Sequence, residues 1–372
     1  MGKYRQNMGN LFIVFTPLQL FVAQQIIRQE RLSDNVVVYG WRSLFSDAYD
    51  MMTMPELWTE SIYIEEYGSW IGDRLSLDVV KKQRHNFRYL HDFCISHNVT
   101  TIYLGEVLNQ TCRFTALYFS HLGYKIVFFE EGTSHYIDRP YNLKTSFKEN
   151  VKQKLLDLLY FRPFFGIDFA KWHCVPNRPY DDLPMDRRFS MIPYHHKPWD
   201  VRLKVEPMMS QKLEEYIASE MDDGNDTVKR VMLMTDPLRE LMKKEDLHIY
   251  FDVIKACLDE IPRNTILYLK FHPREIEESR KKILDIAEQS GLTYRILSKK
   301  VNICVEYYLQ KYRFDKIYFF NAATFFYNGY AFPKTHFEKL LPVVYKKAKE
   351  AGIDNLTYME NMLKKIEPIC LG

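Results

Sequence analysis

The stretch Lys270-Phe271-His272-Pro273-Arg274-Glu275 decides the fold, because it lies where a predicted strand gives way to a predicted helix. The run before it, 265–271, is apolar and continuous, as expected of a strand covered on both faces. The segment after it, 275–289, is charged and has helical spacing. A histidine and an arginine therefore follow the carboxyl end of a strand, and at that edge open α/β sheets bind their ligands.

Strand and helix patterns alternate on both sides of this stretch. The apolar runs that predict strands are 11–15, 35–39, 61–64, 100–104, 125–129, 228–235, 265–271, 292–297 and 314–320. The segments that predict helices are 18–28, 75–97, 109–122, 246–261, 279–290, 301–312 and 336–366. This alternation indicates an α/β protein with parallel sheets and helices on both faces.

The length and one irregular region divide the chain into two predicted Rossmann-like domains. A chain of 372 residues fits about two domains. Residues 141–210 interrupt the alternation, and 176–198 is rich in proline and charge, as linkers are. We therefore expect domains over 1–200 and 201–330, followed by C-terminal helices over 331–372.

The overall composition excludes several classes of protein. A hydrophobic content of 47% and a charged content of 27% are ordinary for a soluble globular protein. A net charge of +3 gives no reason to expect a nucleic-acid partner. The six cysteines lie far apart without a Cys-x-x-Cys pair, which argues against a zinc site or a disulfide scaffold. We expect reduced thiols and a cytoplasmic protein.

Two segments are candidates for contact with a membrane. Residues 11–27 are apolar on average but are interrupted by polar residues, so they are too polar to span a bilayer and they lack a secretory cleavage site. Residues 144–172 mix basic and aromatic side chains, a composition suited to an anionic membrane surface. The same composition suits a helix packed on its own domain, and the sequence leaves both interpretations open.

Polar side chains follow several of the predicted strands. They are Thr16, the turn Glu130-Glu131-Gly132, Asp236, His272 with Arg274, and Asn321 to Thr324. Because the carboxyl ends of parallel strands meet at one edge of a sheet, we expect these groups to gather there.

The run Asn321-Ala322-Ala323-Thr324 has the properties of a phosphate site. Small side chains let backbone N–H groups approach an anion, and the start of a helix adds favourable partial charge. The chain has no GxxxxGK[ST] loop and no GxGxxG after a strand, so the standard ATP and dinucleotide sites are not predicted. Close packing of a strand against a helix would explain the small residues equally well.

A histidine and a carboxylate facing a phosphate indicate group transfer. The carboxylate would take a proton from an acceptor hydroxyl, and His272 as imidazolium would stabilise or protonate the departing phosphate. No cluster of carboxylates has metal-ligand spacing. We therefore expect no metal ion, with the phosphate charge met by His272, by helix ends and by Arg274.

Several of these residues also occur, in the same order, in a known family of proteins. The chain resembles the bacterial lipooligosaccharide sialyltransferases (glycosyltransferase family 52) and, more distantly, the bacterial capsule polysialyltransferases. The matching features occur in the family's order between about residues 11 and 326. They are Phe15 to Leu20, Phe129 to Thr133, Thr235 to Leu238 with Glu240, His272 to Arg274, and Phe319 to Thr324.

The resemblance implies a GT-B architecture, in which two Rossmann-like domains face a central cleft. It implies an acceptor-side domain over 1–200 and a nucleotide-sugar domain over 201–330. It also implies CMP-sialic acid as donor substrate without a cofactor or metal, inversion at the anomeric carbon, and a glycan acceptor of lipooligosaccharide or capsule. Contact with the inner membrane and a homodimer are further expectations.

Carried over residue by residue, the resemblance gives His272 the role of acid or phosphate stabiliser. The base is one of Glu130, Glu131 and Asp236, and the sequence leaves that choice open. The resemblance predicts donor contacts at Gly132, Pro273, Arg274, Asn321, Ala322, Ala323 and Thr324, and substrate contacts at Thr16 and Gln19.

Two other functions remain open on the same scaffold. One is transfer from another CMP-nonulosonate or from a UDP-hexose. The other is a non-catalytic glycan-binding or assembly protein, although clustered acid and base groups argue against a pure binder.

Overall fold

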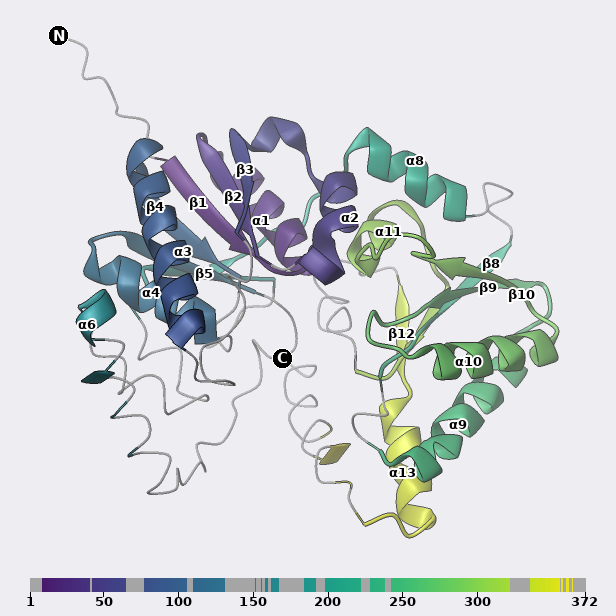
Figure 1. The fold of residues 1–372 in the computed structure, drawn as a ribbon. Helices are drawn as coiled ribbons and strands as arrows, with labels where there is room; N and C mark the ends of the chain where they lie inside the picture. Colours follow the sequence, from purple (N-terminus) through teal and green to yellow (C-terminus); the bar gives the residue numbers. More distant parts are fainter. Residues whose placement is uncertain are drawn as a thin grey trace. The chain divides into compact units, whose positions relative to one another are not determined.

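The structure divides into two units. The computed structural model describes residues 9–40, 42–64, 77–105, 110–130, 151, 155, 158–159, 162–166, 184–191, 198–221, 228–237, 242–321, 335–354, 356, 359–360 and 363 (Figure 1). The first unit is Met1–Glu206 and the second is Pro207–Gly372.

The first unit is built on a seven-stranded sheet with the order β3-β2-β1-β4-β5-β6-β7. All neighbouring strands are parallel. The strands are β1 (Gly9–Val14), β2 (Asn35–Tyr39), β3 (Glu60–Tyr63), β4 (Val99–Leu104), β5 (Lys125–Phe129), β6 (Arg187–Ser190) and β7 (Asp200–Arg202). This is the Rossmann order, and its topological switch point lies between β1 and β4.

Helices pack on this sheet and follow its strands. They are α1 (Pro17–Glu30), α2 (Arg42–Met52), the 3-10 helix η1 (Pro55–Leu57), α3 (Leu77–Ser96), α4 (Gln110–His121) and α6 (Arg162–Phe165). Leu11 and Ile13 of β1 join Phe87 of α3 and Phe114 of α4 in one buried core cluster. In the described part of the chain, no helix combines the length and the apolar character needed to cross a membrane.

The second unit repeats the same order with five parallel strands, β10-β9-β8-β11-β12. The strands are β8 (Lys229–Met234), β9 (Thr265–Lys270), β10 (Thr293–Leu297), β11 (Lys316–Phe319) and β12 (His336–Lys339). The helices are α8 (Gln211–Glu220), the 3-10 helix η6 (Lys244–Asp246), α9 (Leu247–Asp259), α10 (Glu277–Ser290), α11 (Val305–Lys311) and α13 (Leu341–Glu350). The switch point of this sheet lies between β8 and β11.

The predicted fold class is confirmed. Every residue of β9 is buried, as its continuous apolar run indicates. The chain has the two Rossmann-like domains with parallel sheets of the GT-B type, and each sheet has the 3-2-1-4-5 order from which such domains are built.

Two predicted segments were wrong in part. The predicted linker, 176–198, contains strand β6, and strand β7 follows it. The helix predicted over 336–366 begins with strand β12, and its helical part starts at Leu341. Helices α2 and α8 were not predicted.

A buried ion pair explains why strand β6 was not predicted. Arg188 is 1% exposed, and its guanidinium donates to Asp200 of β7 at 2.6 Å. A buried arginine is tolerated only when a partner of opposite charge compensates it. The partner lies twelve residues further along the chain, so the pattern of apolar residues could not reveal the strand.

Candidate active site

The carboxyl ends of β8 and β11 meet at the switch point of the second sheet, and two predicted site residues lie there. Asp236 comes two residues after β8, and Asn321 comes two residues after β11. Oδ2 of Asp236 accepts a hydrogen bond from the backbone N–H of Asn321 at 2.6 Å. The structure thus joins two of the predicted groups at the position where Rossmann-like sheets bind ligands.

His272 follows the neighbouring strand, β9, and is fixed to the end of β8. Its backbone N–H donates to Thr235 Oγ1 at 3.0 Å, and the N–H of Thr235 donates to the carbonyl oxygen of Lys270 at 3.0 Å. These bonds continue the pairing of β8 and β9 beyond the strands. His272 and Asp236 therefore lie at the same edge of the second sheet.

A tight turn determines which ring nitrogen of His272 carries the proton. The N–H of Glu275 donates to the carbonyl oxygen of His272 at 2.9 Å, and the N–H of Arg274 donates to Nδ1 of the ring at 3.1 Å. A nitrogen that accepts from a backbone N–H cannot itself hold a proton. The proton of the neutral ring is therefore on Nε2, which remains available as a donor.

The ring of His272 is neutral near pH 7. Burial, followed by the positive charges of Arg274 and Lys270, lowers its pKa to about 4. The imidazolium expected from the sequence concerns a ring that faces a departing phosphate, and it stays a prediction. The neutral ring can still donate a hydrogen bond from Nε2 to an anion.

Lys270, which the sequence analysis did not select as a site residue, is a buried cation beside His272. Its Nζ donates to Oδ1 of Asn302 at 3.1 Å. Burial lowers its pKa to about 8, so the amine is still mostly charged near pH 7. The signal that could have revealed it is a lysine closing an otherwise apolar strand, since a buried lysine is rare without a partner.

The structure describes only some of the other residues that were predicted to bind the donor. Pro273 and Arg274 lie on the exposed side of the turn. Oδ1 of Asn321 is shielded from solvent and has no hydrogen-bond partner in the described structure. Gly132, Ala322, Ala323 and Thr324 lie outside the described residues.

Glu130 of the predicted acidic pair is buried. Its side chain has no exposed surface, and Oε2 accepts from the N–H of Met191 at 2.7 Å. Its backbone N–H donates to the carbonyl oxygen of Phe189 at 3.1 Å. Glu130 thus joins the end of β5 to the end of β6. Its partner in the pair, Glu131, lies outside the described residues.

Thr16 and Gln19 form the turn between β1 and α1 at the switch point of the first sheet. Thr16 caps α1 by accepting from the N–H of Gln19 at 3.2 Å, and Gln19 Oε1 accepts from the N–H of Phe15 at 2.5 Å. A Cβ on Gly105, at the end of β4, would lie 2.6 Å from Cδ of Gln19. Gln19 is fully buried, so it shapes the turn, whereas Thr16 is partly exposed.

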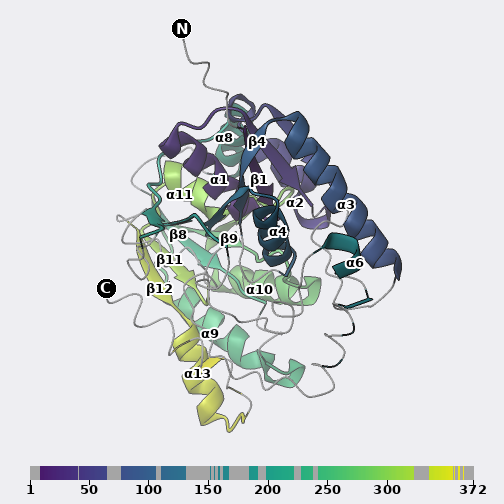
Figure 2. The same cartoon turned by 90° about the vertical axis from the view of Figure 1, so that its left-hand side faces the viewer.

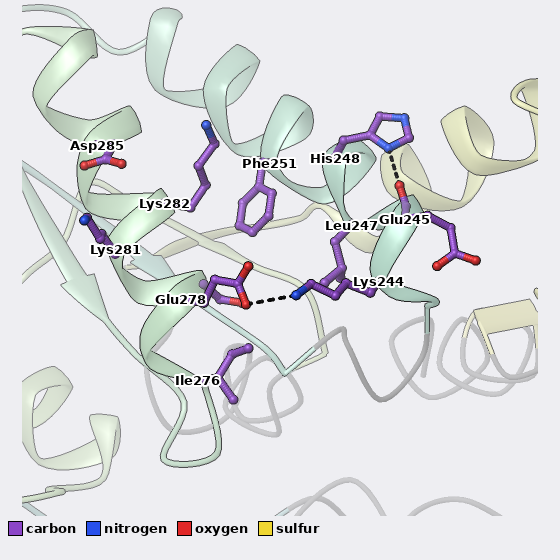
Figure 3. A pocket seen from close by; sticks show the side chains of 11 residues that line it. Lys244, Glu245, Leu247, His248, Phe251, Ile276, Glu278, Lys281, Lys282 and Asp285 are labelled. Atoms are coloured by element: carbon purple, nitrogen blue, oxygen red, sulfur yellow. Dashed lines mark hydrogen bonds and ion pairs between the residues drawn. The ribbon is translucent and has the colours of Figure 1, made fainter.

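A separate pocket lies in the second unit between α9 and α10 (Figure 3). Its volume is about 610 Å³, and Leu247, Phe251 and Ile276 contribute apolar surface. An ion pair of 3.4 Å between Lys244 and Glu278 crosses it, and both side chains are largely exposed. Its lining includes none of His272, Asp236 and Asn321, so it is distinct from the switch-point site. Among the described residues, no group of His, Cys, Asp and Glu side chains could hold a metal ion.

Comparisons with known proteins place the chain in a family. A family model described as alpha-2,8-polysialyltransferase (POLYST) matches residues 10–339. No curated protein sequence matches the chain. The polysialyltransferase part of the predicted resemblance is confirmed, and the lipooligosaccharide part stays a prediction.

Similar solved structures include three proteins of low sequence identity. The spinosyn rhamnosyltransferase SpnG has 12% identity and a TM-score of 0.45, covering 98% of this chain and 96% of its own. UDP-GlcNAc 2-epimerase from Methanocaldococcus jannaschii has 11% identity and a TM-score of 0.47, covering 97% and 92%. E. coli ADP-heptose lps heptosyltransferase II has 13% identity and a TM-score of 0.41, covering 98% and 99%.

The matched range of the family model begins in β1 and ends with the last residue of β12, so it includes both sheets. The protein therefore belongs to the alpha-2,8-polysialyltransferase family.

Proposed function

We propose that the protein is an inverting sialyltransferase that moves sialic acid from CMP-sialic acid to a hydroxyl group of a bacterial surface glycan. Family membership supports a sialyltransferase. The observation that carries the proposal is the edge of the second sheet, where neutral His272 and the bonded pair Asp236 and Asn321 follow adjacent strands. The family's description favours an acceptor that ends in sialic acid and an α2,8 linkage.

The second unit would bind the donor. The CMP phosphate would lie against the segment that starts at Asn321, and the carboxylate of Asp236 would hold the first N–H of that segment in place. Nε2–H of His272 would donate to a phosphate oxygen, and the buried charge of Lys270 would favour the anion. These groups and Thr324 would meet the phosphate charge without a metal ion.

The reaction would proceed as one displacement. A carboxylate removes the proton of the acceptor hydroxyl. The oxygen of that hydroxyl then forms a bond to the anomeric carbon of sialic acid. The bond from that carbon to the CMP phosphate oxygen breaks, and CMP leaves with the bonding electrons. Because attack and departure occur on opposite faces, the product has the inverted configuration.

We assign the base to Glu131. Glu130 has no exposed surface and is bonded to Met191, and one oxygen of Asp236 is committed to Asn321. Glu131 is the remaining carboxylate of the three that the sequence selects. The acceptor would then be bound by the first unit, near Thr16.

We further propose a cytoplasmic location. The described cysteines Cys94, Cys112, Cys257 and Cys304 are all free thiols. Burial raises the pKa of Cys94 and Cys257 to about 12, so these two are unreactive thiols. A homodimer stays a prediction.

The nucleotide preference discriminates this proposal from a UDP-hexose transferase. CMP at about one hundred times its Kd should stabilise the folded donor unit by about 2.7 kcal/mol. For a domain of this size the melting temperature should then rise by about 5–10 °C. Differential scanning fluorimetry with equal concentrations of CMP, UDP and GDP measures the effect. A larger shift with UDP or GDP would favour the alternative donor, and no shift with any nucleotide would favour a non-catalytic glycan-binding protein.

A further inference from the structure

Lys270 is the lysine that the described residues bury most deeply. It is 7% exposed and is the last residue of β9. Its Nζ donates to Oδ1 of Asn302 at 3.1 Å, in the loop between β10 and α11. An ammonium group has three N–H donors, and this bond to a neutral amide uses one of them. Two donors therefore remain, and no carboxylate of the described residues is bonded to the ammonium.

Other lysines of the second unit are bonded to carboxylates. Lys311 of α11 is paired with Glu214 at 2.7 Å, and Lys316 of β11 is paired with Glu338 of β12. Both lysines are partly exposed, so water also helps to stabilise their charge. Burying an ammonium without a bonded carboxylate is costly. The arrangement at Lys270 is therefore more typical of a binding site than of a structural ion pair.

The two carboxylates near Lys270 are bonded to other groups. Glu220 of α8 accepts from the hydroxyl of Tyr308 of α11 at 2.5 Å. Both views show α8 and α11 side by side (Figures 1 and 2). The thiol of Cys304 is hydrogen-bonded to Glu306. Glu220 and Glu306 therefore act on the ammonium only through their charge.

The charge of Lys270 acts at the donor edge of the second sheet. Successive side chains of a strand alternate between its two faces, so Lys270 and His272 share one face. Burial, and then the positive charges of Arg274 and Lys270, lower the pKa of His272. The ammonium is therefore close enough to act on the ring that would face the donor phosphate.

We propose that Asn302 is a positioning residue for donor binding, which holds the ammonium of Lys270 at this edge and leaves its charge for the donor phosphate. A neutral amide can fix the ammonium in place without neutralising it, as a carboxylate would. This role rests on the proposed function in that the donor carries a phosphate, and it does not depend on which nucleotide the donor contains.

Donor binding should weaken at alkaline pH. Burial lowers the pKa of Lys270 to about 8, Cys304, Glu220 and Glu306 oppose this lowering, and Arg280 of α10 adds to it. The ammonium is therefore charged near pH 7 and loses its proton as the pH rises through about 8. Above that range the phosphate loses its attraction to Lys270.

The test is isothermal titration calorimetry of CMP with the purified full-length protein, from about pH 7 to about pH 9.5, where the phosphate keeps its double charge. The Kd of the unchanged protein should rise about tenfold, the effect of one hydrogen bond from a charged donor. Lys270→Met should bind CMP about tenfold more weakly near pH 7 and show no further rise. Lys316→Met is the matched control, because Lys316 begins β11 at the amino edge of the same sheet. It should bind CMP as the unchanged protein does at each pH.

Asn302→Asp separates positioning from a merely structural role. The new carboxylate has the reach of the amide and should bond to Nζ of Lys270, which would raise the pKa of the lysine. The midpoint of the rise in Kd should then move upward by about one pH unit or more. Near pH 7 this variant should bind CMP more weakly, because the ion pair takes up the positive charge. Loss of a contact that only stabilised the loop would leave the midpoint in place.

A Kd for CMP that stays constant over this pH range in the unchanged protein would overturn the role of Lys270, as would equally tight binding by Lys270→Met. An unmoved midpoint in Asn302→Asp would overturn the role of Asn302. If UMP binds with the alkaline rise and CMP does not bind, the proposed donor fails while the roles of both residues stand. Binding of no nucleotide at any pH would overturn both.

Discussion

Replacing His272 by Ala is expected to lower the turnover number about 10²–10³-fold, the span typical of losing one hydrogen-bond donor to a group on which negative charge develops. The variant loses the Nε2–H that the tautomer leaves available for the leaving phosphate. Steady-state transfer from CMP-sialic acid measures the effect. The KM for the donor should change much less than the turnover number, because the hydrogen bond strengthens as charge develops on the leaving group.

Two further variants at residue 272 separate the loss of the hydrogen-bond donor to the phosphate from the loss of the acceptor within the turn. In His272→Asn the amide oxygen can take the place of Nδ1 and accept from the N–H of Arg274, as asparagine does in turns. That variant should fold as stably as the unchanged protein and still be slow. In His272→Gln the amide NH₂ can replace the Nε2–H donor, so part of the rate should return. Transfer by His272→Asn at nearly the unchanged rate would remove His272 from the mechanism.

The pH dependence gives an independent check on the same residue. Since burial and nearby positive charge lower the pKa of His272 to about 4, the ring of the free enzyme stays neutral from about pH 5 upward. The value of kcat/KM should therefore show no ionisation of this residue near pH 6.5, the value for a solvated histidine. Bound phosphate should raise the pKa, which a ¹⁵N titration of the ring with and without CMP measures.

Replacing Glu131 by Gln should also lower the turnover number about 10²–10⁴-fold, because the amide cannot take the proton of the acceptor hydroxyl. The matched control is Glu130→Gln, one residue earlier. Its carboxylate is buried against the N–H of Met191, and the amide oxygen of glutamine can accept the same hydrogen bond. The first unit should therefore lose at most about 1–3 kcal/mol of stability, while turnover of the folded enzyme stays within a few-fold. Chemical denaturation and transfer rates measure the two effects.

A different result would move the assignment to Asp236. If Glu131→Gln keeps its rate and Asp236→Asn loses it, the base lies on the donor unit. On the present assignment Asp236→Asn should keep most of the rate, because the amide oxygen of asparagine can still accept the hydrogen bond from the N–H of Asn321.

The parallel sheets were predictable because their strands are continuous apolar runs, as β9 illustrates. The strands that were missed are held by interactions distant in sequence. Strand β6 contains Arg188, and Asp200 on β7 compensates its buried charge. Strand β12 has the sequence His-Phe-Glu-Lys, in which a single apolar residue gives no pattern, and it lies at the edge of its sheet.

The sequence predicted where the residues of the candidate site lie better than it predicted their protonation states. The strand-end rule placed His272 and Asp236 at one edge of the second sheet, and the structure has them there. The neutral state of His272 depends on its burial and on the charges of Arg274 and Lys270, and the sequence pattern does not reveal the burial. The burial of Glu130 against the N–H of Met191 likewise depends on a contact 61 residues away.

The most direct test is incubation of the purified protein with CMP-sialic acid and labelled acceptors, including lactose-like and sialylated oligosaccharides. The account predicts one CMP released for each acceptor that gains one sialic acid, with the new bond inverted relative to the donor and formed best on a sialylated acceptor. Mass spectrometry and NMR determine the product and its linkage. Intact CMP-sialic acid with every acceptor, or a product that retains the donor's configuration, would contradict the account.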